Sequence, residues 1–297
     1  MRLLALLLVL GFALCAPALA NYSIFCDQQS KLSAEQKDRL FLFAAAIKTQ
    51  MDASGHSLAV IERAGINLDR FGLRYSHSGI SLKESGNTPW SVRQLYYSCD
   101  KDEPLLYDQG LSGFLIDQDN RRTPFISLVF LPNDAEQSLR QTALDKPVAL
   151  QLLGKGYSAN AYAYSTQFQN CNQWVMEVLA HAWGHLPPDG DLRAAAQAWL
   201  AEQHYHPTDV RVNTLIQLGG MMVPLVHSSD HPAENRRHGL FQVSMPASLD
   251  AFVQGRVPGA ERVEMCMNQD QIVVHHGWDL IAPGCVAAPG DTVLPVL

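Results

Sequence analysis

The sequence predicts an α+β protein in which an antiparallel sheet packs on a helix that carries a cysteine. Three observations lead to this fold class. Strand-like segments joined by turn residues follow an N-terminal helical segment, an amphipathic helix begins at a cysteine in the middle of the chain, and short strand patterns return towards the C-terminus. The chain has 297 residues, which is enough for one large domain or a domain with an extension.

The first expected element is a helix that begins at Ser33. Gln36 follows three residues later, which is the pattern of a capping box, and the apolar side chains behind it have close to helical spacing. Strand patterns come next, at residues 58–64, 74–83 and 90–97. Turn residues at 84–87 separate the last two patterns, so we expect these two strands to form a β-hairpin.

The clearest helix in the sequence covers residues 170–182. Trp174, Val178 and Ala182 lie on its apolar stripe, and Cys171 is in its first turn. Around this helix the patterns are shorter. They predict strands at 125–131 and 148–153 and helices at 134–144 and 191–203, and they leave 105–116 ambiguous.

The character of the chain changes near residue 205. Prolines and glycines become frequent, and only short strand patterns appear, at 239–245, 262–267 and 272–274. We therefore expect residues 21–205 to form the core and residues 206–297 to form a C-terminal extension packed on it.

Residues 1–20 are predicted to be a signal peptide. Arg2 gives a positive start, residues 3–14 form an apolar run, and Ala18-Leu19-Ala20 is a small-x-small cleavage site. The expectation is a periplasmic or secreted protein whose mature chain begins at Asn21.

The composition narrows the range of partners. The net charge is −7 and there is no basic block, which argues against a nucleic-acid partner. After the first twenty residues, no stretch approaches the roughly 18 apolar residues of a membrane-spanning helix. The expected partner is a small-molecule, peptide or cell-wall substrate. No cofactor or metal is expected, and the sequence leaves the oligomeric state open.

Cysteine parity points to one free thiol. Of the six cysteines, Cys15 lies in the predicted signal peptide, and an odd number remains in the mature chain. The expected disulfides are Cys266–Cys285, which are close in sequence, and Cys26–Cys99, and these leave Cys171 free. Four cysteines allow three pairings, and reduced, buried thiols remain an alternative.

A thiol in the first turn of a helix is suited to nucleophilic catalysis. Unpaired backbone N–H groups and the positive end of the helix dipole favour a thiolate there, and a neighbouring imidazolium would favour it further. Asn170 is the expected N-cap, and the Cys171 N–H could stabilise an oxyanion. The exposed, low-pKa thiol predicted in this way would also be easily oxidised outside the cytoplasm.

His77 is the candidate base for Cys171. It lies near the start of the first strand of the expected hairpin, and Gly79 on the same face leaves room for a close neighbour. Counting round the hairpin places Gln94 near His77, where its side-chain oxygen could accept the ring N–H; Glu84 is the second choice. Tyr75 is a further candidate for the surroundings of the site.

These two motifs resemble a known group of enzymes. A histidine in the setting Ser76-His77-Ser78-Gly79-Ile80, followed much later by Asn170-Cys171 at a helix start, is similar to the circularly permuted papain-like (NlpC/P60-related) cysteine hydrolases. The resemblance implies a permuted papain-like core with Cys171 as nucleophile, His77 as base and Gln94 as the third polar residue. The implied reaction is hydrolysis or acyl transfer at an amide or ester, for example in peptidoglycan peptides.

Most of the mature chain also resembles the bacterial family called domain of unknown function 2145. The matching stretches are residues 75–80, 107–111, 169–177, 230–232 and 277–278. This resemblance implies no particular activity.

Two other functions stay open at this point. A non-catalytic cell-envelope binding protein could keep the same fold for its groove. A metal-binding protein could use His181 and His185, which have i, i+4 spacing on the Cys171 helix, although the helix lacks the glutamate of a zinc-protease motif.

Overall fold

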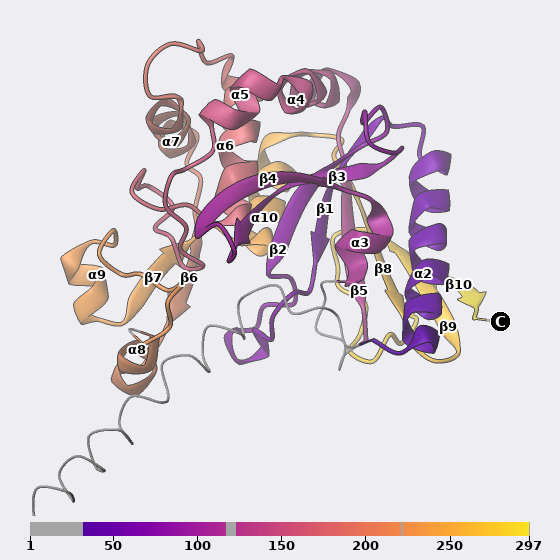
Figure 1. The fold of residues 1–297 in the computed structure, drawn as a ribbon. Coiled ribbons are helices and arrows are strands. Elements are labelled where there is room, and N and C mark those ends of the chain that lie inside the picture. The colour runs from indigo at the N-terminus through magenta and orange to yellow at the C-terminus, as the bar shows by residue number, and fades with distance from the viewer. Residues whose placement is uncertain (1–31, 117–122, 221, 297) are drawn as a thin grey trace, which may run out of the picture.

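The computed structural model describes residues 32–116, 123–220 and 222–296, and its centre is an antiparallel sheet of eight strands. The order across the sheet is β10-β9-β8-β5-β1-β2-β3-β4 (Figure 1). In chain order these strands are β1 (Leu58–Arg63), β2 (His77–Leu82), β3 (Ser91–Ser98), β4 (Glu103–Gln109), β5 (Phe125–Phe130), β8 (Glu261–Met267), β9 (Gln271–His276) and β10 (Thr292–Pro295). A separate two-stranded sheet pairs β6 (Thr208–Arg211) with β7 (Leu240–Val243).

Helices cover both faces of the large sheet, which makes a three-layer α+β fold (Figure 1). One face packs on α2 (Ala34–Ala53) and α3 (Leu111–Ile116). The other face packs on α4 (Asn133–Leu144), α5 (Lys146–Gln151), α6 (Cys171–Gly184), α7 (Leu192–Glu202) and α10 (Pro246–Arg256). A 3-10 turn, η2 (Asp69–Phe71), precedes β2, while α8 (Thr214–Gly220) and α9 (Ala233–Arg237) accompany the small sheet.

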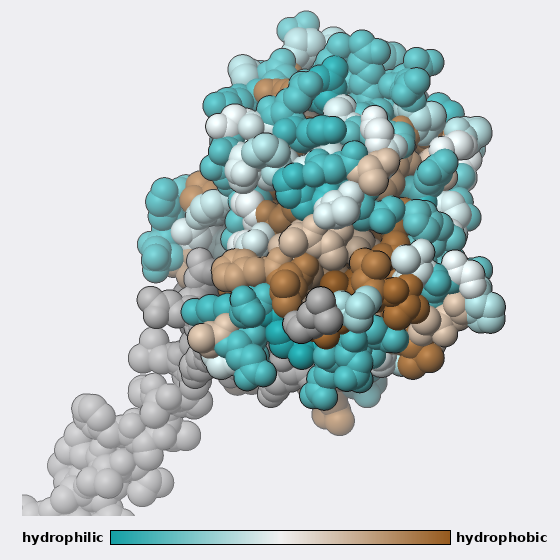
Figure 2. Space-filling view, turned by 90° about the vertical axis from the view of Figure 1, so that its right-hand side faces the viewer, coloured by the Kyte–Doolittle hydropathy of each residue, from teal (hydrophilic) through white to brown (hydrophobic). Residues whose placement is uncertain are grey.

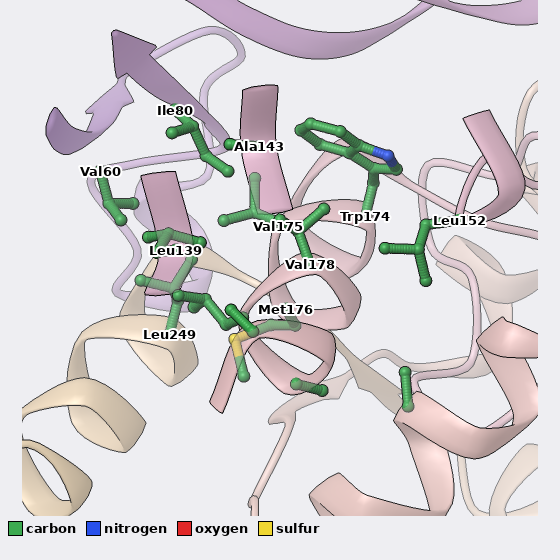
Figure 3. Close-up of a cluster of buried hydrophobic side chains, with 14 of the residues drawn as sticks. Val60, Ile80, Leu139, Ala143, Leu152, Trp174, Val175, Met176, Val178 and Leu249 are labelled. Atoms are coloured by element: carbon green, nitrogen blue, oxygen red, sulfur yellow. The ribbon is translucent and has the colours of Figure 1, made fainter. Parts of the chain in front are cut away.

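The core on the α6 face is built around one buried helix. Trp174, Val175 and Val178 of α6 are fully buried in one cluster with side chains of the sheet and of the neighbouring helices (Figure 3). Val60 and Ile80 of the sheet and Leu139 of α4 belong to the same cluster. The apolar stripe predicted for this helix is therefore confirmed.

Local patterns placed several elements correctly. The capping box at the start of α2 is confirmed: the Gln36 amide donates to Ser33 Oγ at 3.1 Å, and the Ser33 amide donates to Gln36 Oε1 at 2.9 Å. The predicted hairpin is the antiparallel pair β2–β3, with Ile80 opposite Arg93. Residues 105–116, which the sequence left ambiguous, divide into the end of β4 and α3.

The strand predicted at residues 148–153 is wrong. These residues lie mostly in α5, because Asp145 caps the helix by accepting the Val148 amide at 3.1 Å and Pro147 occupies the first turn. A short apolar run does not by itself distinguish a strand from a buried helix.

The C-terminal third completes the central sheet. The sequence predicted an extension packed on the core, but β8 pairs with β5 along six residues of each strand, and β9 and β10 continue outward from β8. The same third also contains α10, which the sequence patterns did not indicate. Pairing between strands so distant in sequence depends on the tertiary fold, so the local pattern carried no sign of it.

The predicted Cys266–Cys285 disulfide is confirmed and joins β8 to the loop before β10. Cys99 is disulfide-bonded as well, but Cys26, its expected partner, lies outside the described residues, as does the predicted signal peptide. Cys171 is a free cysteine, as parity suggested.

Apolar side chains gather on the face that carries α2 (Figure 2). Exposed apolar residues of α2 and β10 are Phe41, Leu42, Val293 and Leu294. Within the described part of the chain, no helix is both long enough and apolar enough to cross a membrane.

Candidate functional site

The site is built around the first turn of α6. Asn170 is the N-cap, as predicted: its Oδ1 accepts the Gln173 amide at 2.7 Å, and its Nδ2 donates to the carbonyl oxygen of Ser244 at 3.3 Å. Cys171 is the first helical residue, and only 5% of its surface is exposed. The cap thus fixes the direction in which the thiol leaves the helix.

Main-chain groups on both sides of His77 contact the thiol. Cys171 Sγ lies 4.0 Å from the carbonyl oxygen of Ser76, and the Ser78 amide hydrogen-bonds the sulfur. The backbone N–H groups of Asn172 and of Cys171 itself also lower the pKa of the thiol. Three backbone N–H groups therefore favour the thiolate form of this sulfur.

His77 is oriented by the residue that the hairpin count selected. Its Nε2 lies 2.5 Å from Gln94 Oε1, and Gln94 Nε2 donates to Gln109 Oε1 at 2.6 Å. Because the Gln94 amide is directed by Gln109, its oxygen faces the imidazole, so Nε2 must carry the hydrogen. Nδ1 is then the ring nitrogen with a free lone pair.

The thiol and the imidazole approach the start of β2 from different sides. The Ser78 hydroxyl faces α6 and donates to Asn172 Oδ1 at 2.9 Å. The neighbouring His77 ring lies on the α3 side, 5.8 Å from the Phe114 ring. Among the described residues, no hydrogen bond joins Cys171 Sγ to the His77 ring.

Both members of the candidate pair are neutral at rest, which corrects the predicted low-pKa thiol. Burial raises the pKa of Cys171 to about 11, although the Ser78 amide and the Arg63 charge oppose it. Burial also lowers the pKa of His77 to about 3, and the charge of Arg63 lowers it further. The sequence pattern predicted the helix terminus, but it did not indicate how completely other elements bury that terminus.

Several residues of the site were missed by sequence reasoning. Arg63 lies opposite His77 in the β1–β2 register, and its guanidinium sits 5.1 Å from the centre of the Phe114 ring. Its charge acts on His77, Cys171 and Tyr157, which places these three in one electrostatic neighbourhood. Burial and then the nearby Cys171 raise the pKa of Tyr157. No short motif marked Arg63 or Tyr157.

Gln109 was also missed, although a signal for it existed. It lies within residues 107–111, one of the stretches that carried the resemblance to the bacterial family. Its side chain packs against Gly113, where a Cβ would come within 2.8 Å of Gln109 Cγ.

Two residues considered in the sequence lie elsewhere. Tyr75 donates its hydroxyl to Glu264 and packs in the cluster around the Cys266–Cys285 disulfide, away from Cys171. Glu84 lies in the hairpin turn and pairs with Arg140 at 2.7 Å.

The histidines of the metal hypothesis are separated by the end of α6. His181 lies within the helix, where Thr142 Oγ1 is 3.4 Å from its Nδ1, while His185 is the left-handed C-cap. The described residues contain no group of three or more His, Cys, Asp or Glu side chains placed to hold a metal ion.

Gly79 leaves room for a close neighbour, as the sequence suggested, and that neighbour is β3. A Cβ at this position would lie 2.5 Å from Val92 Cγ1 and 3.0 Å from the Arg93 carbonyl oxygen. We expect Gly79→Ala to lower the free energy of unfolding by about 1–3 kcal/mol, because β3 must move to make room. Urea unfolding would measure the loss.

Gly86→Ala is the matched control for this variant. It lies in the turn of the same hairpin and has no atom within 4 Å of the added Cβ. Equal stability of the two variants would contradict the close approach of β2 and β3.

Comparison with known proteins finds one family. The family model described as "Uncharacterized protein conserved in bacteria (DUF2145)" matches residues 50–253, which include both His77 and Cys171. No curated protein and no solved structure matches the chain.

Proposed function

The chain belongs to the family of uncharacterized proteins conserved in bacteria (DUF2145), and we propose that it is an exported, thiol-dependent hydrolase or acyltransferase with a permuted papain-like core. Its substrate is an amide or ester, Cys171 is the nucleophile and His77 is the base. The proposed location, periplasmic or secreted, rests on the signal-peptide pattern of residues 1–20.

One observation carries the proposal. A free thiol lies in the first turn of a helix, where three backbone N–H groups lower its pKa, beside a strand whose histidine is oriented by a glutamine. Structural cysteines in a core do not need converging N–H donors, whereas an acyl-transfer site needs them for the developing negative charge. The chain order, with the His77 strand before the Cys171 helix, is the order of the permuted papain-like group.

The proposed reaction starts from the neutral pair. As Cys171 Sγ bonds to the substrate carbonyl carbon, its proton moves to Nδ1 of His77, and the carbonyl oxygen becomes an oxyanion near the amides of the helix start. His77 then returns the proton to the leaving nitrogen or oxygen, the bond to the leaving group breaks, and a thioester remains. Water, or another nucleophile in acyl transfer, attacks the thioester and restores the thiol.

Burial accounts for the survival of such a thiol outside the cytoplasm. With its pKa near 11 the sulfur is almost entirely protonated at neutral pH, and oxidants react with the thiolate. In the proposed cycle, substrate binding must bring Sγ and the His77 ring together, because they approach β2 from opposite sides at rest.

Amides of peptidoglycan peptides are the substrates that best fit the proposed location. This choice rests on analogy of fold and compartment, and lipid or other ester substrates fit the same chemistry.

A non-catalytic binding protein of the same fold is the second candidate. The observation that favours it is the resting state, in which the thiol is 5% exposed and makes no hydrogen bond with the imidazole.

Acylation by p-nitrophenyl acetate distinguishes the two candidates. The hydrolase should release p-nitrophenolate and carry an acetyl group on Cys171, detected by peptide mass spectrometry after acid quenching. His77→Ala should slow acylation by about 100-fold or more, the usual contribution of a general base. His276→Ala, which removes an exposed histidine of β9, should leave the rate unchanged.

The opposite result would support the binding protein. It would consist of no acetyl-Cys171 in the folded protein between pH 6 and 9, or of equal rates in wild type and His77→Ala.

A further inference from the structure

A row of buried polar residues crosses the sheet on the face that packs against α6. In the strand register, Glu62 of β1 lies opposite Ser78 of β2 and Ser127 of β5, and Ser127 lies opposite Glu264 of β8. All four are fully buried. Cross-strand partners share a face, and the Ser78 hydroxyl contacts α6, so the row begins beside the Cys171 helix and runs under α10.

Charged groups of β8, of α10 and of the segment before β2 meet this row. Arg262 of β8 donates to Ser127 Oγ at 3.0 Å, lies 3.2 Å from Asp250 Oδ2 of α10, and reaches Glu264 Oε1 at 3.5 Å. Before β2, Arg74 pairs with Glu264 at 2.8 Å and Tyr75 donates its hydroxyl to the same carboxylate. These are the ionisable and charged groups around the Glu62–Asp250 pair.

The cluster contains one more carboxyl group than it has guanidinium groups. Glu62, Asp250 and Glu264 face two guanidinium groups, those of Arg74 and Arg262. Glu264 is fully engaged: besides its two arginines and Tyr75, its Oε2 accepts the Ile281 amide. Glu62 differs, because among the described residues neither of its carboxyl oxygens accepts a hydrogen bond at standard geometry.

A fully buried, unpaired carboxylate is strongly disfavoured, whereas a protonated carboxyl is tolerated. Burial, and next the negative charge of Asp250, raise the pKa of Glu62 well above its ordinary value, against the charge of Arg262. Burial also raises the pKa of Asp250 to about 6. One added proton removes the excess negative charge of the whole cluster.

The same helix that carries Asp250 contacts the cap of the Cys171 helix. Ser244 and Met245 lie just before α10. The Ser244 carbonyl oxygen accepts a hydrogen bond from Asn170 Nδ2 at 3.3 Å, and Met245 Sδ lies 3.9 Å from Asn172 Nδ2. Ser78, at one end of the polar row, binds Asn172 as well. The buried carboxyl pair and the candidate nucleophile are therefore joined through α10 and β2.

We propose that the buried cluster of Glu62, Asp250 and Glu264 keeps one proton, on Glu62, that this proton holds α10 on the sheet, and that its loss loosens the contacts of α10 with the first turn of α6. The contact between α10 and the first turn of the Cys171 helix is then sensitive to pH. This inference does not depend on the proposed hydrolase activity.

The direction of the pH effect follows from the raised pKa. A carboxyl whose folded-state pKa lies above its unfolded value keeps its proton in the folded protein at pH values where the open form has lost it. Stability of the α10 contact is therefore greatest below about pH 4.5, the ordinary pKa of a glutamate, and falls as pH rises towards the folded-state pKa. One proton corresponds to about a tenfold change in the opening constant per pH unit.

Hydrogen exchange of the α10 amides tests the proposal. After division by the intrinsic exchange rate at each pH, the opening constant of α10 should rise about tenfold per unit between about pH 4.5 and 6 in the wild type. Glu62→Gln keeps the shape of the neutral acid and should flatten this dependence. Asp250→Asn should flatten it too, and serves where the first variant folds poorly.

Glu84→Gln is the matched control, since Glu84 is exposed and pairs only at the surface with Arg140. Its opening constant should follow the wild type. A wild-type opening constant that is flat across this range, or equal slopes in Glu62→Gln and the wild type, would overturn the proposal.

Discussion

Cys171 in the folded protein should be alkylated by iodoacetamide at least about 100-fold more slowly at pH 8 than in urea, because the thiolate is the reactive species. With a pKa near 11, about one sulfur in a thousand is ionised at pH 8 in the folded protein. In the unfolded chain, a thiol with the ordinary pKa of about 8.5 is about one-quarter ionised. Burial of the sulfur slows the reaction further.

The pH profile gives the stronger version of this test. Between pH 7 and 10 the labelling rate of the folded protein should rise about tenfold per unit, without the plateau near pH 9 expected of an exposed thiol. The measurement is peptide mass spectrometry of the Cys171 peptide without reductant, so that the cysteines in disulfides stay protected.

Rapid labelling of Cys171 at pH 6 would contradict the neutral resting state. It would restore the simpler expectation from the sequence, in which the helix terminus and an imidazolium hold a thiolate. Labelling at the same rate in the folded and unfolded protein would contradict the burial of the thiol.

Replacing Arg193 by methionine should lower the free energy of unfolding by about 3–5 kcal/mol, the cost of breaking a buried ion pair. Its partner Glu177 is fully buried in α6 and accepts Arg193 Nε at 2.8 Å and Nη2 at 3.1 Å. Gln197 and Gln169 also donate to this carboxylate, at 2.7 and 2.6 Å, but they carry no charge. The variant would leave an uncompensated charge inside the protein.

The same variant should also expose the candidate nucleophile. Arg193 donates to the carbonyl oxygens of Thr166 and Phe168, at 2.8 and 3.0 Å, and so holds the segment that leads into Asn170 and Cys171. We expect Cys171 to be alkylated faster in Arg193→Met than in the wild type under conditions where both are folded.

Two further variants show whether the buried charge is the cause. Glu177→Met combined with Arg193→Met removes both charges and should be more stable than Arg193→Met alone. Arg140→Met breaks the exposed pair with Glu84 and should change stability by less than about 1 kcal/mol. If Arg193→Met resembles Arg140→Met in urea unfolding, the ion pair does not stabilise the fold as argued.

Local sequence patterns predicted the elements whose causes are local. The capping box of Ser33 and Gln36, the N-cap Asn170 and the apolar stripe of α6 each depend on residues within a few positions of one another. The meeting of His77 with Gln94 was predictable for a similar reason, because a short turn sets the register of a hairpin.

Other features depend on contacts that no window of sequence contains. β8 joins the sheet only because β5 presents its free edge, and Gln109 reaches Gln94 only because β4 returns beside β3. The helix at residues 146–151 was misread because an apolar run of this length suits either structure, and the Asp145 cap decided between them.

By itself, the sequence determined which groups of the candidate site exist and which lie close together. Parity left Cys171 free, its pattern placed it at a helix start, and the hairpin brought Gln94 to His77. The tertiary structure decided their ionisation. Burial depends on elements from the whole chain. For Cys171 it raises the pKa more than the backbone N–H groups lower it, and for His77 it lowers the pKa, so that both groups are neutral.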